Sequence, residues 1–354
     1  MKKFKRKISA KNKEILNKFK FKNKIVLFGF NEISIYFFKK NISKVFVLDK
    51  IFFDKIANRH KDISFITTEE IDPECIIINC ITGIDAGLIS KRLNYFNNNV
   101  FSWIEIKNAF KFEDFSYWYL VEFDRFFFKN LTKFKLLFEK LSDLRSRKEF
   151  LKILSYKVTG CEKVLKFSSA KTYEQYFPEF INFNKKSVLV DVGAYNGDTI
   201  KNFIKTKKKF KNIIAFEPDK KNFKVLEENF ISDKRITVFN KALGSENILK
   251  KFNSSQDKSK FDENGIHYVP VVTLDSFNII PDFIKVDIEG SEKGFILGSK
   301  NTIAKYKPQL AICVYHRPED FFYLTDLILS INKEYKVYFR HHSHGFTESV
   351  MYFI

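Results

Sequence analysis

The chain is poor in the residues that would mark it as a disulfide-rich or metal-rich protein. Its 354 residues include only 4 cysteines, 7 prolines and 12 glycines. The cysteines, at positions 75, 80, 161 and 313, have neither the paired spacing of a zinc site nor the pattern of a disulfide framework. Cys75 and Cys80 flank a short apolar run, so we expect both to pack as small core residues.

Long apolar runs are also missing. No stretch of about 18 apolar residues occurs, so the sequence predicts no transmembrane segment. The first residues, 1–7, are basic, but no apolar segment follows them, and we expect no signal peptide. A cytoplasmic enzyme is the default expectation.

Positively charged residues outnumber negatively charged ones. Lysine and arginine total 62 against 42 acidic residues, which gives a formal net charge of +20. Such a charge favours acidic partners such as nucleic acid, an anionic membrane or a phosphorylated substrate. The lysines are scattered, however, and Asn, Ile and Phe are also frequent, as in any AT-rich coding sequence. The charge is therefore compatible with a purely compositional origin.

The length and the 45% hydrophobic content predict a globular chain of two domains. Residues 1–22 form a basic, helical lead-in with little to bury. Residues 23–110 alternate apolar runs with helical patterns and indicate a small Rossmann-like α/β domain. Gly29 is the only glycine of its first turn, which disfavours a dinucleotide site, whereas Asp49 still leaves a nucleotide-binding role open beside a structural one.

Residues 111–180 are predicted to form a helical linker region that is rich in aromatic side chains. The run 115–128 fits either a helical layer packed between domains or a helix for a membrane surface or a dimer. A homo-oligomer is therefore left open. Pro178 is expected to end this region just before the main sheet.

Residues 181–354 predict a second α/β domain. Apolar runs predict strands at 187–193, 212–217, 236–240, 282–288, 309–315, 335–340 and 347–353, and helical patterns lie between most of them. The last two runs are joined by His341–Gly345 alone, which predicts an antiparallel hairpin. A doubly wound parallel sheet closed by one C-terminal hairpin is the layout of class I methyltransferases.

A glycine turn follows the first strand of this domain. Val188–Val192 is an apolar run broken by Asp191, and Gly193 and Gly197 bracket the turn before a helix that Asp198 can cap. An acid before the first glycine repels a pyrophosphate but suits a ligand with a cationic centre. Glu217 ends the next strand, where a carboxylate can accept both ribose hydroxyls. The pattern therefore fits S-adenosylmethionine.

Three blocks carry a more specific resemblance. They are Asp191–Thr199, Phe216–Asp219 and Ile284–Glu292, and the stretches 174–177 and 315–320 also fit. With these blocks the chain resembles the FkbM family of S-adenosylmethionine-dependent methyltransferases over roughly residues 140–354. The resemblance implies O-methylation of a hydroxyl group on a sugar, either nucleotide-linked or in a surface glycan, or on a related small molecule.

The candidate site residues follow from their places at the ends of strands. Asp191 and Gly193 are expected at the methionine end of the cofactor and Glu217 at the ribose. Asp219 or Asn222, together with the loop after the third strand, is expected near the adenine. The candidate cofactor-binding residues are Asp191, Gly193, Tyr195, Gly197, Asp198, Glu217, Asp219 and Ala242.

Asp287, Glu289 and His316 are the candidate catalytic residues. The two acids alternate at the end of the fourth strand and His316 ends the fifth, so all three face the edge where open α/β sheets bind ligands. Methyl transfer to a hydroxyl benefits from a general base, and the ordinary pKa of histidine, about 6.5, suits that role. The same three residues are candidate ligands for a divalent metal such as Mg²⁺, which the sequence does not require.

Several alternatives stay open at this stage. A nucleic-acid methyltransferase fits the positive charge, but Asp-Ile-Glu-Gly stands where an Asn-Pro-Pro-aromatic motif would be expected, so nucleic acid is disfavoured. A non-catalytic scaffold would have no need of the four acids Asp191, Glu217, Asp287 and Glu289 together. His341, His342 and His344 suit a solvated turn better than a substrate rim or metal site. Residues 245–272 lack periodicity and are expected to form a loop or lid, with a short strand at 269–272.

Overall fold

The computed structural model describes residues 2–21, 24–49, 56, 59–60, 62–82, 86–96, 99–112, 122–165, 174–206, 209–253, 260–261, 265 and 267–354. The chain divides into two compact units. Unit 1 comprises Met1–Leu131, Phe150–Ala170 and Ser343–Thr347, and unit 2 comprises Thr132–Glu149, Lys171–His342 and Glu348–Ile354. The boundaries at 23, 111 and 181 stay predictions. None of the helices among the described residues is long and apolar enough to cross a membrane.

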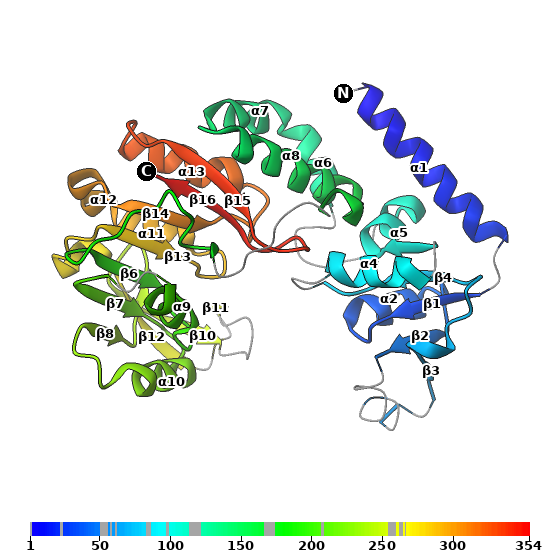
Figure 1. The fold of residues 1–354 in the computed structure, drawn as a ribbon, viewed down its shortest axis with the longest axis horizontal. Helices are drawn as coiled ribbons and strands as arrows, with labels where there is room; N and C mark the ends of the chain where they lie inside the picture. The colour runs from blue at the N-terminus through cyan, green and yellow to red at the C-terminus, as the bar shows by residue number, and fades with distance from the viewer. Residues whose placement is uncertain are drawn as a thin grey trace. The chain divides into compact units, whose positions relative to one another are not determined.

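Unit 1 is built on a five-stranded parallel sheet (Figure 1). Its strands have the order β3-β2-β1-β4-β5. The strands are β1 Ile25–Phe28, β2 Val45–Leu48, β3 Ser64–Thr67, β4 Ile76–Asn79 and β5 Val100–Ser102, and the helices that follow β1, β4 and β5 are α2 Glu32–Lys39, α4 Ala86–Phe96 and α5 Trp103–Phe110.

The N-terminal helix α1 spans Lys2–Phe21, so the helical prediction for the lead-in is confirmed. The expectation that this helix has little to bury is wrong. Ile15 is buried, and the ring of Phe19 packs against the rings of Phe101 and Phe110 at centroid distances of 6.3 and 5.1 Å. A few apolar side chains on an otherwise basic helix are therefore enough to dock it on α5.

The segment after unit 1's sheet is helical where it is described. It contains α6 Phe123–Lys129, α7 Leu131–Lys140, α8 Leu144–Thr159 and the 3₁₀ turn η3 Glu162–Leu165. Residues 113–121, which include part of the aromatic run, lie outside the described residues, as do residues 166–173. Within unit 2, Phe134 of α7 is buried against Phe322, with ring centroids 5.3 Å apart. This contact agrees with a packed helical layer.

Unit 2 contains the predicted doubly wound sheet with its C-terminal hairpin. Seven strands have the order β15-β16-β14-β13-β6-β7-β8; β16 is antiparallel to both neighbours, and the other pairings are parallel. The strands are β6 Val188–Val192, β7 Asn212–Phe216, β8 Ile236–Phe239, β13 Phe283–Val286, β14 Gln309–Cys313, β15 Val337–His341 and β16 Ser349–Phe353. The hairpin strands are red in Figure 1.

Helices connect these strands and leave the carboxyl ends of the strands at one edge. They are α9 Asp198–Thr206, α10 Lys220–Phe230, α11 Glu292–Gly298, α12 Lys300–Tyr306 and α13 Asp320–Ile331, with the 3₁₀ turn η5 at Leu274–Phe277. Two helices lie between β13 and β14, because the chain leaves the helical conformation at Ser299, whose φ is −120°.

A second, four-stranded sheet replaces most of the loop expected over 245–272. Its order is β11-β10-β12-β9, with β9 Ala242–Leu243, β10 Ile248–Asn253, β11 Lys260–Phe261 and β12 His267–Val272. The loop expectation is wrong for β10, which is a strand. The sequence does not indicate this strand, because only Phe252 is buried in it and its apolar residues alternate too weakly. Residues 254–259, 262–264 and 266 of the expected lid lie outside the described residues.

Candidate active site

The glycine turn between β6 and α9 is held by backbone geometry that its sequence requires. Gly193 has a φ of +79°, and a Cβ there would overlap the carbonyl oxygen of Asp287. Gly197 has a φ of +85°, and a Cβ there would overlap the ring of Phe230. The turn also holds Tyr195 in the left-handed region, with a φ of 50°. Only glycine permits such close approach at positions 193 and 197.

Asp191, at the start of this turn, is completely buried. Its Oδ1 lies 3.0 Å from the Nζ of Lys285, which is also buried and donates a hydrogen bond to the carbonyl of Gly193 at 2.6 Å. Burial raises the pKa of Asp191, and Lys285 opposes that rise. Burial lowers the pKa of Lys285, but Asp191 and Asp287 raise it above its ordinary value. The buried ion pair of Asp191 and Lys285 therefore holds the glycine turn in place through the carbonyl of Gly193.

Glu217 follows β7 and is held by two backbone amides. Its Oε2 accepts a hydrogen bond from the amide of Tyr195 at 2.8 Å, and its Oε1 accepts one from the amide of Asp219 at 2.8 Å. Burial raises the pKa of Glu217 to about 7, although both amides favour the charged form. The side chain is thus oriented against the glycine turn, where the sequence predicted a ribose-binding acid.

The remaining predicted cofactor residues have mixed surroundings. Asp219 caps α10, because its Oδ1 accepts hydrogen bonds from the amides of Lys221 and Asn222. Asp198 is exposed and begins α9, where its Oδ1 accepts from the amide of Thr199. Ala242 is buried in β9. The structure therefore gives Asp219 and Asp198 structural contacts at helix starts.

Asp287 lies beyond the end of β13 and is surrounded by donors. The hydroxyl of Tyr176 donates to its Oδ2 at 2.8 Å, and the hydroxyl of Tyr315 lies 3.3 Å from its Oδ1. Burial favours the neutral acid, but His316 and Lys285 together with Tyr176 hold the pKa of Asp287 below its ordinary value. Asp287 is therefore an ordered, ionised carboxylate.

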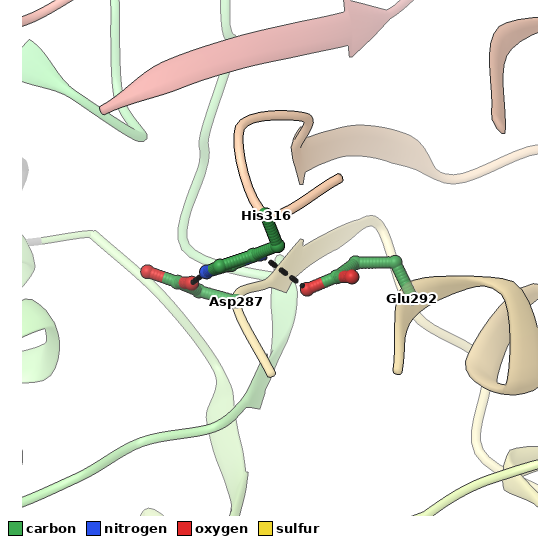
Figure 2. Close-up of side chains that lie close together, drawn as sticks. All are labelled: Asp287, Glu292 and His316. Carbon is green, nitrogen blue, oxygen red and sulfur yellow. Dashed lines mark ion pairs between the residues drawn. The ribbon is translucent and has the colours of Figure 1, made fainter. Parts of the chain in front are cut away.

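His316 lies between carboxylates (Figure 2). Its Nδ1 is 3.0 Å from Oε1 of Glu292, and its Nε2 is 3.4 Å from Oδ1 of Asp287 and 3.7 Å from Oε2 of Glu289. Burial lowers the pKa of His316, but Glu292, Asp287 and Glu289 together raise it to about 10. The imidazole is therefore charged at neutral pH, whereas the sequence interpretation relied on a pKa of about 6.5.

The cluster of Asp287, Glu292 and His316 contains residue types that can bind a metal ion, and the ligand atoms lie within 4.8 Å of one another. The arrangement does not fit one ion well. Figure 2 shows Asp287 and Glu292 at different edges of the ring, each near a different nitrogen, and an ion bound to one nitrogen is directed at only one of these carboxylates. The cluster is better described as a set of ion pairs.

The histidines near the hairpin do not form a solvated turn, so that interpretation is wrong. His341 and His342 are buried. The Nδ1 of His341 lies 2.9 Å from the hydroxyl of Ser349, and the Nε2 of His342 lies 2.8 Å from the hydroxyl of Tyr352. Each ring is thus satisfied by the neighbouring strand β16, which sequence spacing alone does not reveal.

Sequence reasoning overlooked two contributors to the site and underrated a third. Lys285 interrupts the apolar run Phe283–Val286, and an isolated lysine in a strand buried on both faces indicates a buried ion pair. Tyr176 lies well before β6, the first strand of the sheet, so no local pattern predicts its hydrogen bond to Asp287. Glu292 stands at the start of a helix, where an acid is common for the helix dipole alone, but it is buried against His316.

Comparison with known proteins gives the class of the fold. A solved structure described as methyltransferase FkbM from Methylobacillus flagellatus KT is similar to the chain, with 23% identity and a TM-score of 0.73. The match covers 94% of this chain and 90% of that one. The strand order of unit 2, with its antiparallel hairpin at the edge, is that of class I methyltransferases.

Two further solved structures match only part of the chain. An rRNA methylase from Streptococcus thermophilus matches at 11% identity and a TM-score of 0.32, covering 48% of this chain and 87% of that one. A SAM-dependent methyltransferase from Aquifex aeolicus matches at 14% identity and a TM-score of 0.31, covering 54% and 95%. Both likenesses are too weak to argue from. A search of curated proteins found no match.

A family model matches the segment that carries the site. Residues 191–346 match the family model described as the methyltransferase FkbM domain. Over this segment the chain matches the FkbM methyltransferase domain, in agreement with the fold of unit 2. The glycine turn, Glu217 and the Asp287–Glu292 turn all lie inside the matched residues.

Proposed function

We propose that the protein uses S-adenosylmethionine and transfers its methyl group to a hydroxyl of a sugar or of a related small molecule. The observation that carries the proposal is Glu217, whose two carboxylate oxygens are oriented by the amides of Tyr195 and Asp219 beside a glycine turn. A carboxylate in that position accepts hydrogen bonds from ribose hydroxyls, and the glycines let the ligand approach the backbone.

The residues around the turn fit the cofactor. S-adenosylmethionine supplies an electrophilic methyl group on a positively charged sulfur. Asp287 and Glu289 give this edge of the sheet a negative character, which suits a cation. Asn240 donates hydrogen bonds to the carbonyls of Glu217 and Pro218 at 2.9 and 3.0 Å, so it fixes the loop that presents Glu217. Most of the binding groups are therefore held in place before the ligand arrives.

The choice of a hydroxyl acceptor rests on the family resemblance and on the chemistry of the edge. Methyl transfer to oxygen requires the acceptor to lie in line with the bond that breaks and to lose its proton. Asp287, Glu289 and His316 gather at the ends of β13 and β14, together with the hydroxyls of Tyr176 and Tyr315. Carboxylates and phenols make many hydrogen bonds to a polyhydroxyl acceptor.

Calorimetric titration with S-adenosylhomocysteine tests the cofactor half of the proposal. We expect the wild type to bind and Glu217→Ala to lose most of the affinity, because each lost hydrogen bond to a charged group costs about 1.5–3 kcal/mol. Glu227→Gln, on the exposed face of α10, is the matched control and should bind normally. Well-folded wild type that does not bind would contradict the proposal and favour a scaffold.

A panel of nucleotide sugars then tests the acceptor half. Each sugar is incubated with the wild type and S-adenosylmethionine, with and without Mg²⁺, and the methylated product is followed by mass spectrometry. We expect a methylated product with at least one nucleotide sugar that carries an uncharged hexose, and we expect the reaction not to require Mg²⁺. Methylation of RNA in preference to every sugar would overturn the sugar assignment while leaving the cofactor site intact.

A further inference from the structure

A line of ionisable side chains runs from the interior to the surface at the ends of β13 and β14. The side chain of Glu292 is 1% exposed, that of His316 is 2% exposed and that of Glu289 is 42% exposed. The imidazole of His316 lies in ion-pair contact with both carboxylates, through Nδ1 to Glu292 and through Nε2 to Glu289. The buried acid and the exposed acid are thus connected through one ring.

Glu292 is also tied to the backbone that carries Glu289. Its Oε1 accepts hydrogen bonds from the amides of Ile288 at 3.1 Å and Gly290 at 3.4 Å. Glu289 itself has a φ of 52°, and Gly290 has a φ of +91°. A non-glycine residue in this region costs about 1–3 kcal/mol, so the surrounding contacts must impose it. The Glu292 carboxylate supplies two of these contacts.

Asp287 is less suited than Glu289 to receive a proton from the acceptor. Tyr176 and Tyr315 donate to Asp287, and its side chain is only 20% exposed. His316 is buried behind the two acids, and neither of its ring nitrogens makes a hydrogen bond of good geometry with the described residues. Glu289 is the most exposed carboxylate of the group and the first that an acceptor would meet.

We propose that Glu292 and His316 are positioning residues that hold Glu289 as the carboxylate receiving the proton of the acceptor hydroxyl. The inference rests on the proposed methyl transfer. As the acceptor oxygen forms its bond to the methyl carbon, the sulfur keeps the electron pair of the broken carbon–sulfur bond. The hydroxyl proton then passes to the carboxylate of Glu289, so that atoms and charge balance.

The charges around His316 agree with a positioning role. Besides Glu292, Asp287 and Glu289, the ring is near Asp320. Burial and the neighbouring Glu292 raise the pKa of Asp320 to about 7. The cations Arg317 and Lys285 lie on the adjoining turn and strand. Carboxylates outnumber cations next to the ring. His316 therefore stays charged and orients the acids instead of accepting the proton itself.

The test is ¹⁵N NMR of the histidine rings in the ligand-free full chain. The chain has six histidines, and His316→Gln identifies the signal of His316. In the wild type we expect this ring to stay charged from pH 6 to 8. In Glu292→Gln its titration midpoint should fall by about 1–3 pH units, because an adjacent opposite charge typically shifts a pKa by that amount. Glu292→Asp should restore most of the shift, and Glu227→Gln should change nothing.

Three results would overturn the proposal. The first is a Glu292→Gln variant whose His316 signal titrates as in the wild type. The second is selective broadening of the His316 signal by Mn²⁺ in the wild type, which would indicate a metal site. The third is a Glu289→Gln variant that keeps its kcat with a sugar acceptor from the panel, since a general base contributes about 10²–10⁴-fold. The first two results do not depend on cofactor binding, and calorimetry with S-adenosylhomocysteine tests the proposed function separately.

Discussion

Lys285 and Asp191 form a buried ion pair beneath the glycine turn, with 3.0 Å between Nζ and Oδ1. The lysine belongs to β13 and the aspartate to β6, and the two residues face each other in the register of these parallel strands. The same Nζ donates to the carbonyl of Gly193. The pair therefore connects the strand that carries the candidate catalytic acids to the turn that carries the candidate cofactor site.

Removing the lysine should be strongly destabilising. Lys285→Met leaves the carboxylate of Asp191 buried without its cation, and breaking a buried pair in this way typically costs about 3–5 kcal/mol. The free energy of unfolding from urea titration measures the loss. The double variant Lys285→Met with Asp191→Asn should recover part of it, because the uncompensated charge is gone. A double variant that is less stable than Lys285→Met would contradict this explanation.

The glycine turn predicts a contrast between two glycine substitutions. Gly193→Ala should lower both stability and affinity for S-adenosylhomocysteine, because Gly193 has a φ of +79° and its Cβ would overlap Asp287. Gly294→Ala is the control. Gly294 lies in helix α11, and a Cβ there would have its nearest neighbouring atom at 3.8 Å. Because alanine favours helix more than glycine does, this variant should be at least as stable as the wild type. Thermal unfolding and calorimetry measure both effects, and equal losses in the two variants would refute the steric argument.

Much of the fold could be predicted because its signals are local. Apolar runs bounded by polar residues indicate buried strands, and the run Val188–Val192 followed by Gly193 indicates a strand and a turn without reference to distant residues. The short link between the last two strands likewise predicts a hairpin. The weak alternation in β10, whose only buried residue is Phe252, gives no comparable signal.

The contacts of the site depend on distant residues and could not be predicted in the same way. The sequence places Asp287 and His316 at one edge, since both follow parallel strands. It does not show that Tyr176 reaches Asp287 from 111 positions away or that Glu292 lies against the ring of His316. These contacts change the expected ionisation of His316, which is set by the number of carboxylates around it.

Asp143 and Arg340 predict an acid-sensitive contribution to the stability of unit 2. The Nη2 of the buried Arg340 lies 2.7 Å from Oδ2 of Asp143. Burial favours the neutral acid, but Arg340 and Ser146 lower the pKa of Asp143 to about 2. A lowered pKa means that this contribution is present above the unfolded value of about 3.9 and is lost as the pH falls towards 2.

The variant Asp143→Asn should therefore be less stable than the wild type at pH 6, and the difference should shrink as the pH falls from 4 to 2. Circular dichroism of urea unfolding at several pH values gives the comparison. Lys140→Gln, which removes an exposed ion pair with Asp326, is the control and should change stability little at any pH. A constant difference between Asp143→Asn and the wild type would exclude ionisation of Asp143 as the cause.

Glu162 in unit 1 predicts the opposite pH dependence. It is 7% exposed, and burial raises its pKa to about 8, although Ser90 and Asn79 favour the charged form. With a raised pKa, the neutral acid stabilises the folded state fully below the unfolded pKa of about 4.3, and this contribution is lost as the pH rises through 8. Glu162→Gln keeps the shape of the side chain but cannot ionise.

Glu162→Gln should therefore differ least from the wild type at pH 5 and exceed it clearly at pH 9. The gain should be on the order of a few kcal/mol, since a tenfold change in an acid dissociation constant corresponds to about 1.36 kcal/mol. Urea unfolding of both proteins at pH 5, 7 and 9 measures it, and all other titrating groups cancel in the difference. Parallel stability curves would mean that Glu162 is ionised in the folded protein at neutral pH, with a cation or ordered water compensating its charge.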